Sequence, residues 1–169
     1  MKTVYLVRHA KSSWDYPELT DFERPLNKRG RKNAPEMGER LKSRKVKFDL
    51  AYSSPAIRAA QTARIITKYV HYGRKQITYL EKLYHCEPQD MIEVIEATDE
   101  QNETIAIFGH NPSLNGFVYN FFNDFHENIP TCGVFAIESD AEKWADFSRS
   151  KMKCVFFDYP KNKQDSNAG

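Results

Sequence analysis

Short apolar segments alternate along this chain with longer segments of helical periodicity, and this alternation constrains the fold more than any other feature. Apolar runs of strand length occupy residues 3–7, 49–52, 76–80, 104–108, 134–137 and 152–157. Apolar residues recur at helical spacing in residues 28–45, 56–69, 88–97 and 113–122. Strands that alternate with helices favour an α/β fold, a three-layer α/β/α sandwich around a mostly parallel central sheet.

The length and composition predict one folded unit. The chain has 169 residues, which suffices for a single hydrophobic core. Hydrophobic residues make up 40% and charged residues 28%, which excludes a wholly disordered chain. No internal repeat or linker divides the sequence, so we expect one domain over residues 1–159 and a polar tail over 160–169.

The overall charge and the cysteines indicate which binding partners and which cellular compartment to expect. Lys and Arg number 25 against 23 Asp and Glu, a balance that predicts neither nucleic acid nor a membrane as partner. No stretch approaches the roughly 20 apolar residues that span a bilayer. The N-terminal apolar run ends at Arg8, which is too early for a signal peptide. The three cysteines lack CxxC spacing, so we expect reduced thiols, a cytoplasmic protein and no metal or other cofactor.

The near-balance of charge hides a strongly basic segment. Residues 24–47 contain ten Lys or Arg and two Glu. One interpretation is a solvated helix face, which is how charge runs usually arise. The other is an electrostatic funnel that attracts a phosphorylated substrate, and the charge run alone leaves both open.

Polar residues suited to phosphate chemistry follow three of the predicted strands. Arg8 and His9 follow the first strand, Arg58 lies after the second, and His110 follows the strand at 104–108. In sheets of this kind ligands bind beyond the carboxyl ends of the strands. Arginine pairs bidentately with phosphate, and a neutral imidazole is a competent nucleophile. We therefore predict a metal-independent phosphate site in which His9 attacks phosphorus while Arg8, Arg58 and His110 hold the oxygens.

Three motifs in this chain resemble a known family. The segments LVRHA at 6–10, SSPAIRAAQT at 53–62 and GHNP at 109–112 are similar, in order and spacing, to the signatures of the histidine phosphatase superfamily, the phosphoglycerate mutase-like group. The resemblance implies that His9 becomes phosphorylated in a phosphate pocket formed by Arg8, Arg58 and His110. Ala10 departs from the wider pattern, since glycine is commonest at that position.

Two further segments resemble one branch of that superfamily. KSSWD at 11–15 and DFERPLNKRG at 21–30 are similar to the short SixA-type phosphohistidine phosphatases. This resemblance implies a phosphohistidine protein as substrate, with Ser12 or Ser13 adding a hydroxyl contact to the phosphate. The alternative is a small-molecule phosphomonoesterase acting on sugar or nucleotide phosphates. A non-catalytic phosphate-binding module is a third reading, against which the complete set of four core residues argues.

The proton donor for the leaving group stays open. Superfamily members that act on alkyl phosphates resemble one another in a Leu-x-acid pattern, and here Leu83-Tyr84-His85 places His85 at the acid's position. Glu81 and Glu87 lie close by, and water is a fourth candidate. An alkoxide leaving group needs a well-placed acid, which contributes about 10²–10⁴-fold. A phosphorylated histidine leaves as imidazole, so a missing carboxylate costs less for that substrate.

The spacing after the third strand predicts an open site. Only 23 residues separate Leu80 from Thr104, and they include one predicted helix. Little chain is therefore left for a lid over a small metabolite. An open pocket with a basic rim would admit a phosphate carried on a protein surface.

Overall fold

The structure, a computed structural model, describes residues 1–163, and its core is a six-stranded mixed sheet. The strands are β1 (Lys2–Arg8), β2 (Leu50–Ser53), β3 (Thr78–Tyr79), β4 (Thr104–Gly109), β5 (Val134–Ser139) and β6 (Met152–Asp158). They lie in the order β3-β2-β4-β1-β5-β6. The first four are parallel, whereas β5 runs antiparallel to both β1 and β6. The predicted α/β fold with a mostly parallel sheet is confirmed.

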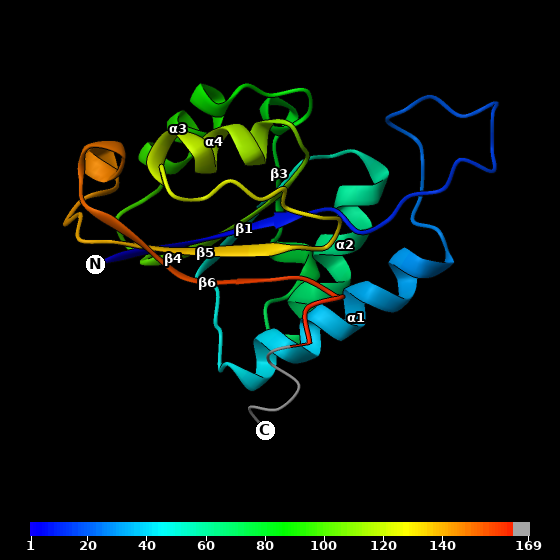
Figure 1. Cartoon of the computed structure of the whole chain (residues 1–169), viewed down its shortest axis with the longest axis horizontal. Helices are drawn as coiled ribbons and strands as arrows, with labels where there is room; N and C mark the ends of the chain where they lie inside the picture. The colour runs from blue at the N-terminus through cyan, green and yellow to red at the C-terminus, as the bar shows by residue number, and fades with distance from the viewer. Residues whose placement is uncertain (164–169) are drawn as a thin grey trace.

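Helices cover both faces of this sheet and complete the predicted three layers (Figure 1). The α-helices are α1 (Lys28–Ser43), α2 (Ile57–Tyr69), α3 (Pro88–Glu96) and α4 (Ser113–Phe121). Three short 3-10 helices are η1 (Arg74–Gln76), η2 (Glu81–Leu83) and η3 (Trp144–Arg149). Helices α1 and α2 lie on one face and α3 and α4 on the other. Each face buries its own apolar cluster, one around Met37, Ile66 and Phe108, the other around Met91, Phe117 and Trp144.

Helix α1 has a very basic sequence, yet one of its faces is apolar and buried. Its residues Ala34, Met37 and Leu41 recur at helical spacing and are fully buried against the sheet. Burying a side chain the size of Leu or Met contributes about 1.5–3 kcal/mol. The Asn27 side chain caps the helix by accepting a hydrogen bond from the amide of Gly30. The charged residues are thereby left to the outer faces of the helix.

The start of α2 differs from the predicted one. The apolar spacing predicts a helix from residue 56. The helix instead begins at Ile57, and its N-cap residue Ala56 has no side-chain cap. The Ser54 hydroxyl accepts from the Ala56 amide and also lies 2.8 Å from Nε2 of His110. Ser54 therefore links the start of the helix to the neighbouring strand end.

Two other segments differ in extent from the sequence prediction. The predicted strand at 76–80 shrinks to the two residues of β3, because Gln76 closes the 3-10 turn η1 and only Thr78 and Tyr79 pair with β2. Helix α1 ends at Ser43, two residues early, where Lys45 takes a left-handed φ of 60°. A helix cannot continue through that backbone conformation.

The long loop at 11–27 projects beyond the carboxyl end of β1, at the right of Figure 1. It is ordered by Arg24, whose guanidinium donates to the Ser13 carbonyl, the Ser12 hydroxyl and the Asp21 carboxylate. A β-bridge between Ser12 and Leu26 closes its base. These contacts hold the loop in one conformation beside the carboxyl ends of the strands.

The chain leaves β6 toward α1. The Pro160 carbonyl accepts a hydrogen bond from Arg40, so the first residue of the predicted polar tail contacts that helix. The rest of that tail, 164–169, lies outside the described residues. In residues 1–163 no helix has both the length and the apolar character to cross a membrane.

Candidate active site

The two predicted site histidines lie side by side at the carboxyl edge of the sheet. Strands β1 and β4 are parallel neighbours, and Arg8 pairs in register with Gly109. The residues that follow these strands are therefore brought together. The amide of His9 donates to the Gly109 carbonyl at 3.0 Å, and the rings of His9 and His110 are 5.2 Å apart. Both histidines are 8% exposed.

Arg58 reaches the same place from the first turn of α2. The Ser54 amide donates to the Phe108 carbonyl, which fixes the β2–α2 connection against the end of β4. Arg58 is 7% exposed and lines a pocket of about 250 Å³ together with His110, Tyr84 and His85. The structure thus brings together groups that the sequence separates by about a hundred residues.

Arg8 precedes His9 at the end of β1, and its guanidinium is only partly hydrogen-bonded. Its Nη1 donates to the Ile129 carbonyl at 3.0 Å. Its Nε is buried and has no hydrogen-bond partner among the described residues, and the same holds for Nδ1 of His110. Buried polar atoms are normally paired, so these two atoms mark positions suited to the oxygens of an anion. Burial also lowers the pKa of Arg8, which favours an anionic partner for this cation.

The electrostatics keep both histidines neutral. Burial lowers the pKa of His9 to about 3, and the nearby His110 and Arg58 add to the effect. Burial and the charge of Arg58 lower the pKa of His110 to about 4. The Nδ1 of His9 lies 2.7 Å from the Ala10 carbonyl, which can only accept, so Nδ1 carries the hydrogen. The lone pair is then on Nε2, the tautomer that a nucleophilic imidazole needs.

Asp21 is the carboxylate that lines the pocket, and no pattern in the sequence predicted a role for it. Arg58 donates to its carbonyl at 2.6 Å and to Oδ2 at 3.0 Å, and the Tyr84 hydroxyl donates to the same Oδ2 at 2.7 Å. Desolvation raises the pKa of Asp21, but the hydrogen bonds from Tyr84 and Arg58 outweigh it and lower the pKa to about 2. Asp21 is therefore ionised, and it fixes the plane of the Arg58 guanidinium.

The three side chains suggested as proton donors have different surroundings. His85 lines the pocket, is exposed, and stacks on the Tyr84 ring with centroids 3.9 Å apart. Glu87 is the N-cap of α3, where it forms a capping box with Asp90. Glu81 is exposed in η2. Of the three, His85 is the one that lines the pocket.

The two serines suggested as phosphate contacts are engaged within the 11–27 loop. The Ser12 hydroxyl accepts from Arg24 at 2.6 Å, and the Ser13 hydroxyl accepts from the Asp15 amide at 3.1 Å. Both are buried, and neither lines the pocket that holds Arg58 and His110. Their clearest contribution is to the shape of the loop.

Cys132 supports the site through its backbone, a role that the sequence did not indicate. Its amide donates to the carbonyls of both Arg8 and His9, at 3.1 and 3.0 Å, from a left-handed φ of 63°. Burial raises the pKa of its thiol to about 12, so the thiol stays neutral. All three cysteines are free. Within the described part of the chain, no group of three or more His, Cys, Asp or Glu side chains could hold a metal ion.

Comparisons with known proteins agree with this geometry. Residues 4–112 match the family model of the histidine phosphatase superfamily (branch 1). An uncharacterized protein of Mycobacterium tuberculosis is 30% identical over 167 residues, covering 92% of this chain and 100% of its own length. A 2,3-bisphosphoglycerate-dependent phosphoglycerate mutase of Bartonella henselae is 40% identical over 67 residues, which are 38% of this chain and 32% of the mutase.

Solved structures share the fold across nearly the whole chain. SixA from Agrobacterium tumefaciens superposes with a TM-score of 0.80 at 24% identity, covering 94% of this chain and 98% of that one. The protein histidine phosphatase SixA complexed with tungstate gives a TM-score of 0.80 at 20% identity over 94% and 97%. A phosphoglycerate mutase from Bacillus anthracis gives a TM-score of 0.60 at 16% identity over 88% and 96%.

Proposed function

Since this chain belongs to the histidine phosphatase superfamily (branch 1) and is a phosphatase, we propose that its substrate is the phosphohistidine of another protein. In this proposal residues 1–159 act as one catalytic domain. His9 is the nucleophile, and Arg8, Arg58 and His110 hold the transferred phosphoryl group.

The proposed reaction begins with in-line attack of His9 on phosphorus. The neutral ring with its lone pair on Nε2 forms the new P–N bond while the bond to the substrate imidazole breaks. The leaving nitrogen takes up one proton, from solvent or from His85 at the pocket mouth. Charge on the equatorial oxygens is held by the buried guanidinium groups, which are positioned before the substrate arrives.

A second in-line step returns the enzyme to its starting state. Water attacks the phosphorus of phosphorylated His9, and the bond from phosphorus to Nε2 breaks. The electron pair of that bond returns to Nε2, which leaves His9 neutral with its hydrogen on Nδ1, and inorganic phosphate carries away the oxygen and the protons of the water. An anion in the pocket would raise the pKa of His110, which makes that ring a hydrogen-bond donor to a phosphate oxygen.

The observation that carries the phosphohistidine proposal is the ionisation of the pocket carboxylate. Asp21 has a pKa of about 2 because Tyr84 and Arg58 hydrogen-bond to it, so it cannot donate a proton near neutral pH. An alkoxide leaving group depends on such a donor, worth about 10²–10⁴-fold. Imidazole has a pKa of about 6.5 and leaves readily without a carboxylic acid beside it.

The test compares two classes of substrate under the same conditions. We expect kcat/KM for a phosphohistidine protein to exceed that for sugar and nucleotide monophosphates by about a hundredfold, the lower end of the range that general acid catalysis contributes. The His9→Ala variant serves as the background for both classes. Equal or faster turnover of the esters would replace this proposal with a small-molecule phosphomonoesterase.

A further inference from the structure

A second hollow, which we call the basic groove, lies beside the candidate active site. It has a volume of about 180 Å³, and the cations that line it are Lys11, Arg29 and Lys161. Its remaining lining includes Pro130, Thr131 and Tyr159, and no Asp or Glu of the described chain contributes to it. The groove is therefore positive on its rim and partly apolar on its walls.

The segment 129–132 connects the groove to Arg8 and His9. The carbonyl of Ile129 accepts from the Arg8 guanidinium, and the amide of Cys132 donates to the His9 carbonyl. The two residues between them, 130–131, line the groove. An extended ligand seated at His9 could therefore continue directly into the groove.

Lys11 is held at this junction by the start of α1. It follows His9 by two residues, and its carbonyl accepts from the Asn27 amide at 2.9 Å. The helix approaches so closely at Gly30 that a Cβ there would lie 2.2 Å from the Lys11 carbonyl oxygen. The backbone of Lys11 thus has a fixed place next to both the pocket and the groove.

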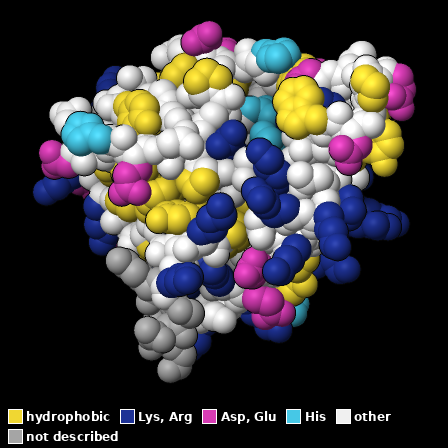
Figure 2. Space-filling view, turned by 45° about the vertical axis from the view of Figure 1, so that its right-hand side comes forward, with side chains coloured by type: hydrophobic (Ala, Val, Ile, Leu, Met, Phe, Trp, Pro, Cys, Tyr) yellow, Lys and Arg dark blue, Asp and Glu magenta, His cyan; other side chains and the backbone are white. Residues whose placement is uncertain are grey.

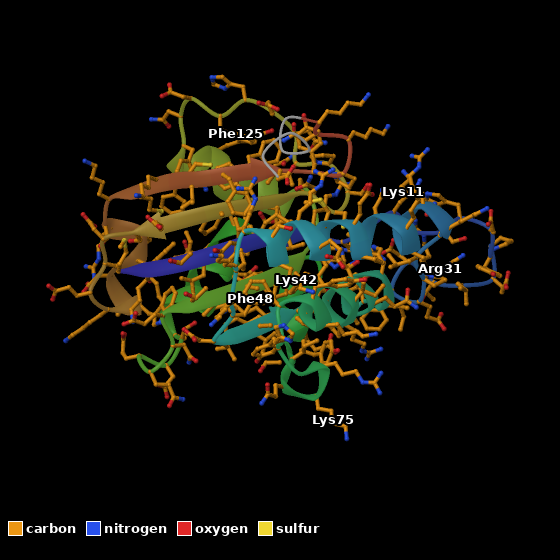
Figure 3. The ribbon with its side chains drawn as sticks, turned by 90° about the horizontal axis from the view of Figure 1, so that it is seen from below. Lys11, Arg31, Lys42, Phe48, Lys75 and Phe125 are labelled. Carbon is orange, nitrogen blue, oxygen red and sulfur yellow. The ribbon has the colours of Figure 1, made fainter. Side chains whose placement is uncertain are left out.

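The basic segment at 24–47 is divided between different surroundings. Arg24 is buried in the loop, and Arg40 pairs with Asp158 at 2.9 Å. Lys42 lies farther along α1, away from the end at which Figure 3 shows Lys11 and Arg31. Part of this charge is therefore used in structural contacts, whereas Arg29 lies at the groove.

The three cations of the basic groove stand apart from those structural pairs. Within residues 1–163, the side chains of Lys11, Arg29 and Lys161 make no hydrogen bond or ion pair. Lys and Arg side chains gather in a band beside a histidine in Figure 2, where the right-hand side of Figure 1 comes forward. Unpaired cations around a hollow repel one another and are complemented by an anionic partner.

We propose that the basic groove binds an acidic segment that flanks the phosphohistidine on the substrate protein. This inference rests on the proposed function and deepens it, because it names the chemistry of the substrate around its phosphorylated residue. Asp and Glu side chains of the segment pair with Lys11, Arg29 and Lys161, while its aliphatic parts contact Tyr159 and Pro130. Exposed pairs of this kind are individually weak, so the groove acts mainly by raising the rate of encounter.

The test uses two phosphohistidine peptides of equal length. One carries Asp and Glu on both sides of the phosphohistidine, and the other carries Asn and Gln at the same positions. We expect the native chain at low salt to favour the acidic peptide about tenfold in kcat/KM, with the preference fading as salt screens the charges. Equal kcat/KM for the two peptides would overturn the groove proposal.

Charge reversals in the groove and far from it test whether the preference for the acidic peptide arises at the groove. The double variant Arg29→Glu/Lys161→Glu should lose the preference for the acidic peptide. Lys75→Glu, which introduces the same kind of change in η1 far from Lys11, should keep it (Figure 3). A double variant that keeps the full preference would overturn the groove as the acidic segment's site.

The same experiment separates the two proposals. If the native chain turns over p-nitrophenyl phosphate but neither peptide, the proposed phosphohistidine substrate is wrong. If it turns over both peptides equally, the proposed phosphohistidine substrate is supported, and the proposal that the groove binds an acidic segment is wrong.

Discussion

The phosphate pocket and the basic groove adjoin one another and both present cations, yet they are built in opposite ways. In the candidate active site, the side chains of His9, Arg58 and His110 are 7–8% exposed, and each is hydrogen-bonded to the protein. In the groove, Arg29 and Lys161 are exposed and make no such bonds among the described residues. Fixed, desolvated groups stabilise a transition state, whereas exposed charges attract and orient a partner.

The largest effect should come from removing the nucleophile. His9→Ala should lower kcat about 10³-fold or more on every substrate, because it removes the nitrogen that accepts the phosphoryl group in the proposed reaction. Steady-state assays with p-nitrophenyl phosphate and a phosphohistidine peptide measure this loss, and circular dichroism confirms that the variant folds. Activity within tenfold of the native chain would contradict the pocket assignment. A groove variant should still turn over the ester, which would separate the two regions.

The buried histidines should also make the fold sensitive to acid. In the unfolded chain they bind protons below the ordinary pKa of 6.5, whereas in the folded chain His110 binds one only near pH 4 and His9 near pH 3. The free energy of unfolding should therefore fall as the pH drops from 6.5 toward 4. With two such groups the slope reaches about 2–3 kcal/mol per pH unit near the middle of that window.

Chemical denaturation at a series of pH values measures this slope. The variant His110→Ala should reduce it by about 1.4 kcal/mol per pH unit, because one proton is removed from the balance. The variant His71→Ala, at an exposed position, is the control. A slope that is unchanged in His110→Ala would show that this ring is protonated in the folded state.

Adding one methyl group at Gly30, which packs against Lys11 beside the groove, should destabilise the fold. Gly30→Ala places a Cβ 2.2 Å from the Lys11 carbonyl oxygen, so the backbone must shift. We expect this overpacking to lower the free energy of unfolding by about 1–3 kcal/mol in urea denaturation. At Gly73 a new Cβ meets only the flexible Gln76 side chain, at 3.3 Å, so Gly73→Ala should be neutral or stabilising. Equal stability of the two variants would contradict the close approach.

A smaller effect should follow from neutralising the pocket carboxylate. Asp21→Asn removes the charge that faces Arg58 but keeps an oxygen for the Tyr84 hydroxyl. KM for p-nitrophenyl phosphate should fall because Arg58 is no longer neutralised. The kcat should fall about tenfold because the guanidinium loses a charge-assisted bond that fixes it. Asp15→Asn in the same loop is the control, and a raised KM in Asp21→Asn would contradict this role.

The two regions also differ in how well the sequence predicts them. Arg8 ends β1, and His9 and His110 directly follow β1 and β4, which are adjacent in the sheet, so the predicted strand ends place the three residues together. Asp21 meets Arg58 across 37 residues and Tyr84 across 63, through a loop without periodicity. Such long-range contacts leave no local pattern, which is why the role of Asp21 was missed.

For the same reason, the sequence does not predict the surroundings of each cation in the basic segment. Composition revealed its charge, but only packing decides which cation is buried, which is paired and which is left at the groove. Arg40 forms an ion pair with Asp158, which is far away in the sequence, and no spacing rule predicts that pair. Helix α2 begins at Ile57 and not at residue 56 for a similar reason, since the hydroxyl of Ser54 contacts His110 as well as the Ala56 amide.

The central claim, that His9 carries the phosphoryl group, can be tested directly. The native chain is mixed with a phosphohistidine peptide, denatured at alkaline pH within the first turnover, digested and analysed by mass spectrometry. The account predicts one phosphorylated peptide, the one that contains His9, and none from the His9→Ala variant. A phosphoryl group on His110 or His85 instead, or rapid turnover by the His9→Ala variant, would contradict it.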